Sequence, residues 1–96
     1  SFTIEHIMPE STHIQAAGRI GNFLPLGEKL NGKVETKPFA SKIQEYRKSQ
    51  YNTVKKFVEK YGHLANWTED NINARTIEMA KIMYYQNKVP YSANAV

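Results

Sequence analysis

The spacing of the hydrophobic residues changes at Pro38, and this change constrains the fold more than any other feature of the chain. Before Pro38, residues 2–7 are rich in β-branched and aromatic side chains, which is typical of a strand. After Pro38, apolar residues recur every three or four positions, which is the period of an α-helix. The order of the two patterns predicts a short sheet followed by helices.

Two short strands and a helical turn are predicted before Pro38. Residues 2–7 form the first strand, residues 10–19 form a loop, and residues 20–26 form the second strand. We expect Pro25 to interrupt the second strand, because proline cannot donate to a ladder of hydrogen bonds. Residues 27–31 are predicted to form a helical turn.

Three helices are predicted after this turn. The first has Pro38 in its first turn, the second ends at Gly62 with a left-handed residue, and the third begins at the cap residue Thr68. Their apolar stripes are, in order, Phe39, Ile43 and Tyr46; then Tyr51, Val54, Phe57, Val58 and Tyr61; then Ile72, Thr76, Met79, Ala80 and Met83.

The predicted class is therefore α+β, with a short N-terminal β-hairpin and helical turn packed on about three α-helices. We expect one domain over residues 1–96, with residues 1–34 as the site region and residues 38–88 as the helical part. The chain begins with Ser1 rather than Met, so we expect a domain of a longer protein.

Composition excludes some classes of function. The absence of cysteine excludes disulfides and a Cys-ligated zinc site, and no apolar run approaches the roughly 20 residues that cross a bilayer. Thirteen Lys and Arg residues against nine Asp and Glu residues give a net charge of +4. This balance is compatible with a polyanionic partner but does not by itself identify one.

One stretch of the chain collects the groups that a one-metal phosphodiesterase needs. His6 offers an imidazole that can take a proton from water near neutral pH. Glu5 and Asn31 offer the oxygen ligands that hard cations prefer, and Asn22 offers a second amide to fix the imidazole. In a regular strand Glu5 and His6 point to opposite faces, so both line one phosphate only if the strand end is twisted.

Each of these residues also has an ordinary structural interpretation. His6 taken alone is more often a surface histidine than a base, and Asn22 and Asn31 stand beside glycines, where asparagine suits turns. His13 is interpreted as a solvated loop residue and His63 as a helix-end residue, so neither is assigned to the site.

The ordered series of motifs resembles a known family. Glu5-His6-Ile7-Met8-Pro9, Gly21-Asn22 and Leu30-Asn31 are similar to the HNH (ββα-metal, His-Me finger) endonucleases. Together with Lys37-Pro38-Phe39, Tyr46, Trp67 and Arg75, they most closely resemble the HNH-like C-terminal domain of GmrSD-type modification-dependent restriction proteins. The resemblance extends from Ile4 to about Met83.

The resemblance implies a metal-dependent DNA endonuclease. It implies that His6 is the general base, that Asn22 holds the loop and orients His6, and that Glu5 and Asn31 bind Mg²⁺, with Mn²⁺ as a substitute. Glu5 stands where many relatives have Asp, and Glu10 where relatives often have Gln.

The resemblance also implies a setting. It places the domain in the bacterial cytoplasm, within an anti-phage restriction protein whose N-terminal domain senses modified DNA and hydrolyses a nucleotide. Two alternatives stay open. One is a catalytically weak nucleic-acid-binding module on the same scaffold; the other is a structural interaction domain, which exposure of Met79, Met83, Tyr84 and Tyr85 would favour.

Basic side chains near the motif are candidates for contacts with phosphates. The predicted nucleic-acid-binding residues are Arg19, Lys33, Lys37 and Arg75, and Lys29 and Lys42 are weaker candidates. Arg75 is as readily a brace for the site as a phosphate contact. Trp67 and the tyrosines on the helical stripes are predicted to lie in the core rather than to stack on bases.

Overall fold

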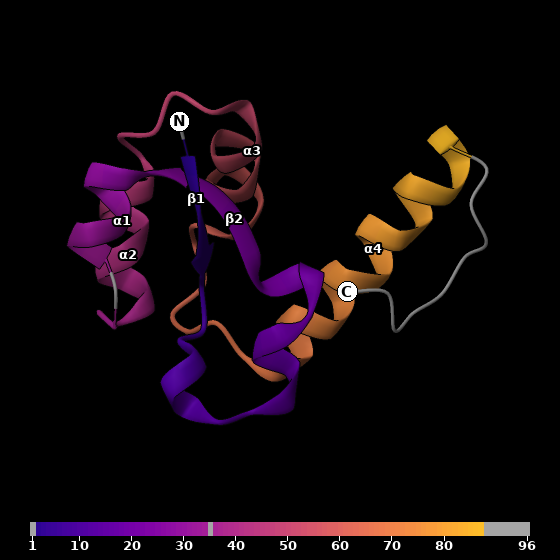
Figure 1. Ribbon diagram of the computed structural model, residues 1–96, viewed down its shortest axis with the longest axis horizontal. Helices are drawn as coiled ribbons and strands as arrows, with labels where there is room; N and C mark the ends of the chain where they lie inside the picture. Colours follow the sequence, from indigo (N-terminus) through magenta and orange to yellow (C-terminus); the bar gives the residue numbers. More distant parts are fainter. Residues whose placement is uncertain (1, 35, 88–96) are drawn as a thin grey trace.

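The computed structural model describes residues 2–34 and 36–87, and it has the predicted α+β architecture (Figure 1). A two-stranded antiparallel hairpin is followed by helices, of which α1, α2 and α3 lie on the hairpin side of the molecule and α4 extends away from it. The elements are β1 (Phe2–His6), β2 (Phe23–Gly27), α1 (Glu28–Val34), α2 (Phe39–Tyr46), α3 (Asn52–Tyr61) and α4 (Glu69–Asn87). Lys88, the last residue of the predicted helical part, lies outside the described residues.

The hairpin pairs β1 with β2 in a register that places His6 opposite Phe23 and Ile4 opposite Pro25. Pro25 does not interrupt β2, contrary to the prediction. In a sheet of two strands each strand has a free edge, and a proline whose nitrogen faces that edge breaks no ladder bond. Leu24 and Leu26 are fully buried beneath the hairpin.

Three short 3₁₀ turns occupy the loop between the strands, at Glu10–Thr12, Gln15–Gly18 and Ile20–Asn22. The last of these, η3, covers residues that were predicted to begin the second strand. It cannot stay extended because Gly21 packs directly on α4, where its N–H donates to Thr76 Oγ1 at 3.0 Å. The strand therefore begins at Phe23.

The helix boundaries follow local signals, with one exception. Pro38 lies at the N-cap position of α2, one residue before the first turn in which it was predicted. Thr68 caps α4, as predicted: Asn71 N–H donates to Thr68 Oγ1 and Thr68 N–H donates to Asn71 Oδ1. The prediction of a left-handed Gly62 is wrong, because Gly62 has a φ of −62°. What requires glycine there is space: a Cβ would lie 2.5 Å from the carbonyl oxygen of Val58.

An aromatic cluster joins the helices. Trp67 is 7% exposed and stacks on Phe39 with ring centroids 5.7 Å apart, which confirms its predicted place in the core. Phe57 packs against the rings of Phe39, Tyr46, Tyr61 and Trp67. The cluster connects α2, α3 and the segment that precedes α4.

Helix α4 has two different halves. Its first half packs on η2 (Gln15–Gly18) and η3, and Ile72 and Thr76 are fully buried there. Its last turns leave Ile82, Met83, Tyr84 and Tyr85 exposed. Among the helices within residues 2–34 and 36–87, none combines the length and hydropathy that crossing a bilayer requires.

The close approach of Gly21 to α4 predicts the effect of adding a methyl group there. A Cβ at position 21 would lie 2.6 Å from the nitrogen of Thr76 and closer still to the carbonyl oxygen of Ile72. We expect Gly21→Ala to lower the free energy of unfolding by about 3 kcal/mol, measured by urea denaturation. Gly32→Ala is the control: it has no atom within 4 Å of a new Cβ and lies within α1, so we expect a gain of about 0.5–1 kcal/mol. Equal effects of the two substitutions would contradict this packing.

Candidate active site on the β-hairpin

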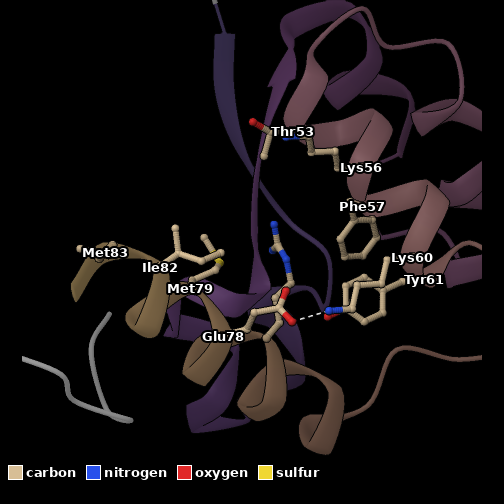
Figure 2. A pocket seen from close by; sticks show the side chains of 10 residues that line it. Thr53, Lys56, Phe57, Lys60, Tyr61, Glu78, Met79, Ile82 and Met83 are labelled. Atoms are coloured by element: carbon tan, nitrogen blue, oxygen red, sulfur yellow. Dashed lines mark hydrogen bonds and ion pairs between the residues drawn. The ribbon is translucent and has the colours of Figure 1, made fainter. Parts of the chain in front are cut away.

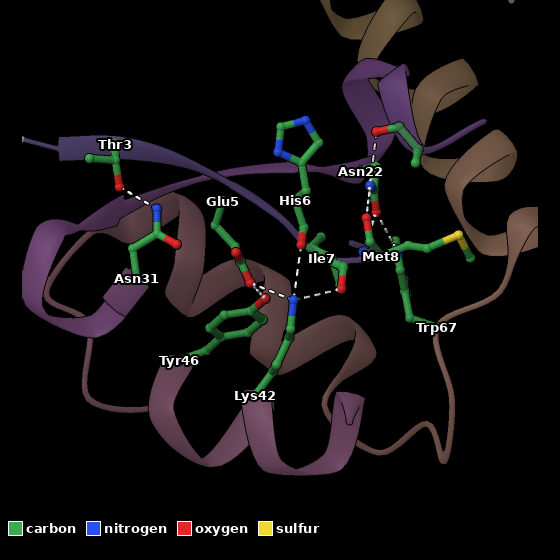
Figure 3. Close-up of polar contacts among 11 residues, drawn as sticks. Thr3, Glu5, His6, Ile7, Met8, Asn22, Asn31, Lys42, Tyr46 and Trp67 are labelled. Carbon is green, nitrogen blue, oxygen red and sulfur yellow. Dashed lines mark hydrogen bonds and ion pairs between the residues drawn. The ribbon is translucent and has the colours of Figure 1, made fainter. Parts of the chain in front are cut away.

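The end of β1 presents Glu5 and His6 to opposite faces of the hairpin (Figure 3). Glu5 points toward α2 and is 3% exposed, whereas the His6 side chain points away from α2 and is 26% exposed. This is the alternation of a regular strand, and the strand end is not twisted enough to bring the two groups together. The imidazole and the carboxylate therefore occupy different environments.

Glu5 lies in a fully satisfied interior cluster. Lys42 Nζ donates to Glu5 Oε2 at 2.9 Å, and the Tyr46 hydroxyl donates to the same oxygen at 2.6 Å. Burial raises the pKa of the Tyr46 hydroxyl above its ordinary value, and the charge of Glu5 raises it further, so the hydroxyl keeps its proton and remains a donor. Burial lowers the pKa of Lys42, while the hydrogen bond and charge of Glu5 oppose that shift.

Sequence reasoning missed this role of Lys42. It placed Lys42 among the candidates for phosphate contact, but the side chain is 1% exposed and points inward. A signal was present in the spacing: Lys42 stands three residues after Phe39 and four before Tyr46, on the buried stripe of α2. A lysine on such a stripe needs an interior acceptor, and the sequence offers Glu5.

His6 has one aromatic and one acidic neighbour. Its ring meets the Phe23 ring edge to face, with centroids 4.9 Å apart and planes at 70°. Its Nε2 atom lies 3.5 Å from Oε1 of Glu10, whose side chain is 77% exposed. The imidazole is thus fixed on one side by a ring and faces a carboxylate on the solvent side.

Asn22 anchors the loop that follows His6. Its side-chain Oδ1 accepts hydrogen bonds from Met8 N–H at 2.7 Å and from Trp67 Nε1–H at 3.1 Å. Its Nδ2 donates to the carbonyl oxygens of Met8 and Ala17 at 2.8 and 3.0 Å. These four bonds hold the main chain two residues beyond His6 and leave the amide with no exposure to solvent.

Asn31 lies on α1 and donates from Nδ2 to Thr3 Oγ1. Thr3 and Glu5 are two residues apart in β1, so Asn31 and Glu5 approach the same face of the hairpin. The structure therefore brings together the two predicted metal ligands on one face of the hairpin, and it leaves the predicted base on the other.

The predicted basic residues divide into two pairs. Arg75 is 6% exposed, and its Nη1 donates to the carbonyl oxygens of Gly21 and Phe23, so it braces the loop. Arg19 likewise donates to Asn73 Oδ1. Lys33 and Lys37 are exposed, and their charges both act on Glu45, which places them on one side of the molecule.

The donor set in this arrangement does not fit the predicted magnesium ion. The one carboxylate that was assigned to it already binds an ammonium group and a phenol hydroxyl at the same oxygen. Over residues 2–34 and 36–87, no three His, Cys, Asp or Glu side chains come together as a metal site. Mg²⁺ binding at this site stays a prediction, and the arrangement disagrees with Glu5 as its ligand.

Two hollows lie near these groups. A groove of about 410 Å³ follows the loop after β1 and is lined by residues that include Met8, Pro9 and Lys37. A second pocket of about 370 Å³ lies between α3 and α4, where Lys60 pairs with Glu78 (Figure 2). The second pocket is mostly apolar and is lined by Arg75 but by neither His6 nor Glu5. The groove is lined by Ile7, Met8 and Pro9, which follow His6 in the chain, but not by His6 itself.

The antiparallel hairpin followed by helices places the chain among α+β domains. More narrowly, the chain belongs to the family of C-terminal domains of GmrSD restriction endonucleases, whose model matches residues 1–82. Comparisons with curated proteins and with solved structures gave no match.

The four bonds of Asn22 predict a large loss of stability when the amide is removed. Asn22→Ala leaves the N–H groups of Met8 and Trp67 without their acceptor, and we expect it to lower the free energy of unfolding by about 3 kcal/mol or more. The control is Asn66→Ala on the exposed segment before Trp67, with an expected change within about 0.5 kcal/mol. Urea denaturation measures both, and a similar small loss in each would contradict an anchoring role.

Proposed function

We propose that this domain hydrolyses phosphodiester bonds in DNA, with His6 as the general base. The observation that carries the proposal is the placement of His6: its imidazole is partly exposed at a strand end, and its carbonyl oxygen and the loop that follows are held by buried hydrogen bonds. A base that solvent can reach, on a main chain held in place by such bonds, suits the activation of a water molecule that attacks a bound phosphate. Membership of a restriction-endonuclease family supports the same reaction.

In the proposed reaction His6 acts directly on water, and Glu10 and Asn22 support it. His6 takes a proton from water, the oxygen of that water attacks phosphorus, and the bond between phosphorus and the 3′ oxygen breaks. The departing 3′ oxygen takes a proton from solvent water, so the products are a 5′-phosphate and a 3′-hydroxyl. The imidazolium formed in this step faces the carboxylate of Glu10, whose negative charge stabilises it. Asn22 acts through the loop that it anchors.

We infer that exposed lysines guide the substrate. Lys33 and Lys37 lie on the same side of the molecule and Lys37 lines the groove, so their charges can neutralise phosphates of a strand bound there. Arg19 and Arg75 join α4 to the loop before β2.

We further propose that the domain is the C-terminal part of a larger bacterial restriction protein that acts in the cytoplasm. In this proposal another domain senses modified DNA and hydrolyses a nucleotide. The family of C-terminal domains to which the chain belongs supports this context. The exposed apolar end of α4 gives such a protein a surface for contact between its parts.

One observation favours a second candidate, a DNA-binding module with a weakened site. The Glu5 carboxylate is committed to Lys42, so the domain has one acidic ligand fewer than the resemblance implies. Salt-sensitive DNA binding without cleavage would identify this function.

The base assignment predicts a selective loss of cleavage. We expect the wild-type domain to nick supercoiled plasmid in the presence of Mg²⁺ or Mn²⁺, and His6→Ala to slow nicking by about 10²–10⁴-fold. His63→Ala is the control, because His63 is also exposed but lies after α3. Equal nicking by wild type and His6→Ala would exclude His6 as the base.

The two lysines predict a change in salt dependence. Replacing Lys33 and Lys37 by alanine should weaken DNA binding and reduce the slope of log K against log salt by about 1 for each phosphate that the protein no longer neutralises. Lys55→Ala with Lys56→Ala on α3 is the matched control, since both residues are exposed and carry the same charge. Fluorescence anisotropy at several salt concentrations measures the slopes; the same slope in both double variants would remove Lys33 and Lys37 from the interface.

A further inference from the structure

The ammonium group of Lys42 lies at the centre of an oxygen cage inside the protein (Figure 3). Nζ donates to Glu5 Oε2 at 2.9 Å, to the carbonyl oxygen of His6 at 3.0 Å and to the carbonyl oxygen of Ile7 at 2.9 Å. A protonated lysine has three N–H donors, so each donor has one acceptor. No other lysine among the described residues is buried in this way.

A carboxylate with two main-chain carbonyls is also a set of ligands that a hard cation accepts. An ammonium group and a divalent ion are therefore rival occupants of the same negative potential. They compete at Glu5 Oε2, because Nζ and the Tyr46 hydroxyl both donate to that oxygen. Lys42 holds its place through the covalent chain of α2, whereas an ion must be captured from solution.

The same contacts connect Lys42 with the candidate base. By binding the carbonyl oxygens of His6 and Ile7, the ammonium group fixes the two peptide planes that follow the His6 Cα atom. The imidazole leaves this Cα on the opposite face of β1. The direction of the imidazole therefore depends on the hydrogen bonds that Lys42 donates to the main chain, although Lys42 does not contact the imidazole itself.

We propose that the Lys42 ammonium group takes the place of a divalent ion at Glu5, and that Lys42 is a positioning residue for His6. Glu5 is then the counter-ion of Lys42 and not a metal ligand. The positioning role rests on the proposed function of His6, whereas the cation role is independent of it.

Metal binding tests the cation role without any activity. We expect Mn²⁺ affinity, measured by electron paramagnetic resonance, to be unchanged by Glu5→Gln or to be undetectable in both proteins. Glu10→Gln is the control, because Glu10 is an exposed carboxylate in the same region. A loss of about tenfold or more in Glu5→Gln alone would overturn the proposal. If Glu5→Gln does not fold, the double variant Glu5→Gln/Lys42→Met, which removes both charges, replaces it.

Removing the ammonium group provides the converse test. Lys42→Ala leaves the buried carboxylate of Glu5 without a cation and leaves space beside it. We expect Mn²⁺ to raise the thermal midpoint of this variant but not that of the wild type or of Glu5→Gln/Lys42→Ala. A midpoint of Lys42→Ala that does not respond to Mn²⁺ would show that the cage is not a cation site.

The positioning role is tested by comparing DNA affinity with the nicking rate of bound DNA, because a loss of folding would lower both. We expect Glu5→Gln/Lys42→Met to bind DNA with unchanged Kd but to nick bound DNA about 10²-fold more slowly. Lys48→Met, which removes an exposed lysine just after α2, is the control. Equal nicking rates in the two variants would overturn the positioning role. If the wild-type domain does not nick DNA, the proposed function fails, and the Mn²⁺ measurements still decide the cation role.

Discussion

The amide of Asn22 is the contact on which the rest of the structure depends. The loop between β1 and β2 spans residues 7–22, and closing a loop of that length costs conformational entropy that the hairpin alone does not offset. Asn22 bonds both polar main-chain groups of Met8 and the indole of Trp67, so it ties the loop to the aromatic cluster. Arg75 adds a second tie, from α4 to the carbonyl oxygens on either side of Asn22. Loop, hairpin and helices become one unit through a few buried donors and acceptors.

Alternate side chains of β1 point into the interior or toward solvent, so Glu5 and the proposed base His6 lie on different faces of the same strand. Odd-numbered positions of β1 face the interior, where Glu5 is neutralised by Lys42, and even-numbered positions face outward, where His6 lies. A buried ion pair contributes little net stability compared with apolar residues of the same volume, because desolvation offsets the attraction. The ion pair between Glu5 and Lys42 instead favours one conformation of the strand end, because other conformations would leave a buried charge without a partner.

The sequence predicted the elements of the fold better than the contacts of the site. Periodicity placed the three long helices, and Pro38 and Thr68 marked the starts of α2 and α4, because caps and stripes are local properties. Gly62, which was predicted to be left-handed, instead keeps a right-handed conformation, in which its N–H donates to the carbonyl oxygen of Val58. The turn η3 was mispredicted because its conformation depends on packing against α4, which no local pattern reveals. The same limit applies to Lys42 and Arg75: each is basic and looks like a surface residue until its partner across the fold is known.

Because Glu5 and His6 lie on opposite faces of β1, their roles cannot be assigned from a sequence resemblance alone. Glu5 and His6 are adjacent in the motif, and a metal ion shared by both would have to reach across the strand. In this domain the interior side of the strand already contains a cation, fixed to α2 and satisfied by three oxygens. The exposed side holds the imidazole and the Glu10 carboxylate. In the proposed reaction, a phosphate approaches from the exposed side, where His6 acts on water without disturbing the buried pair.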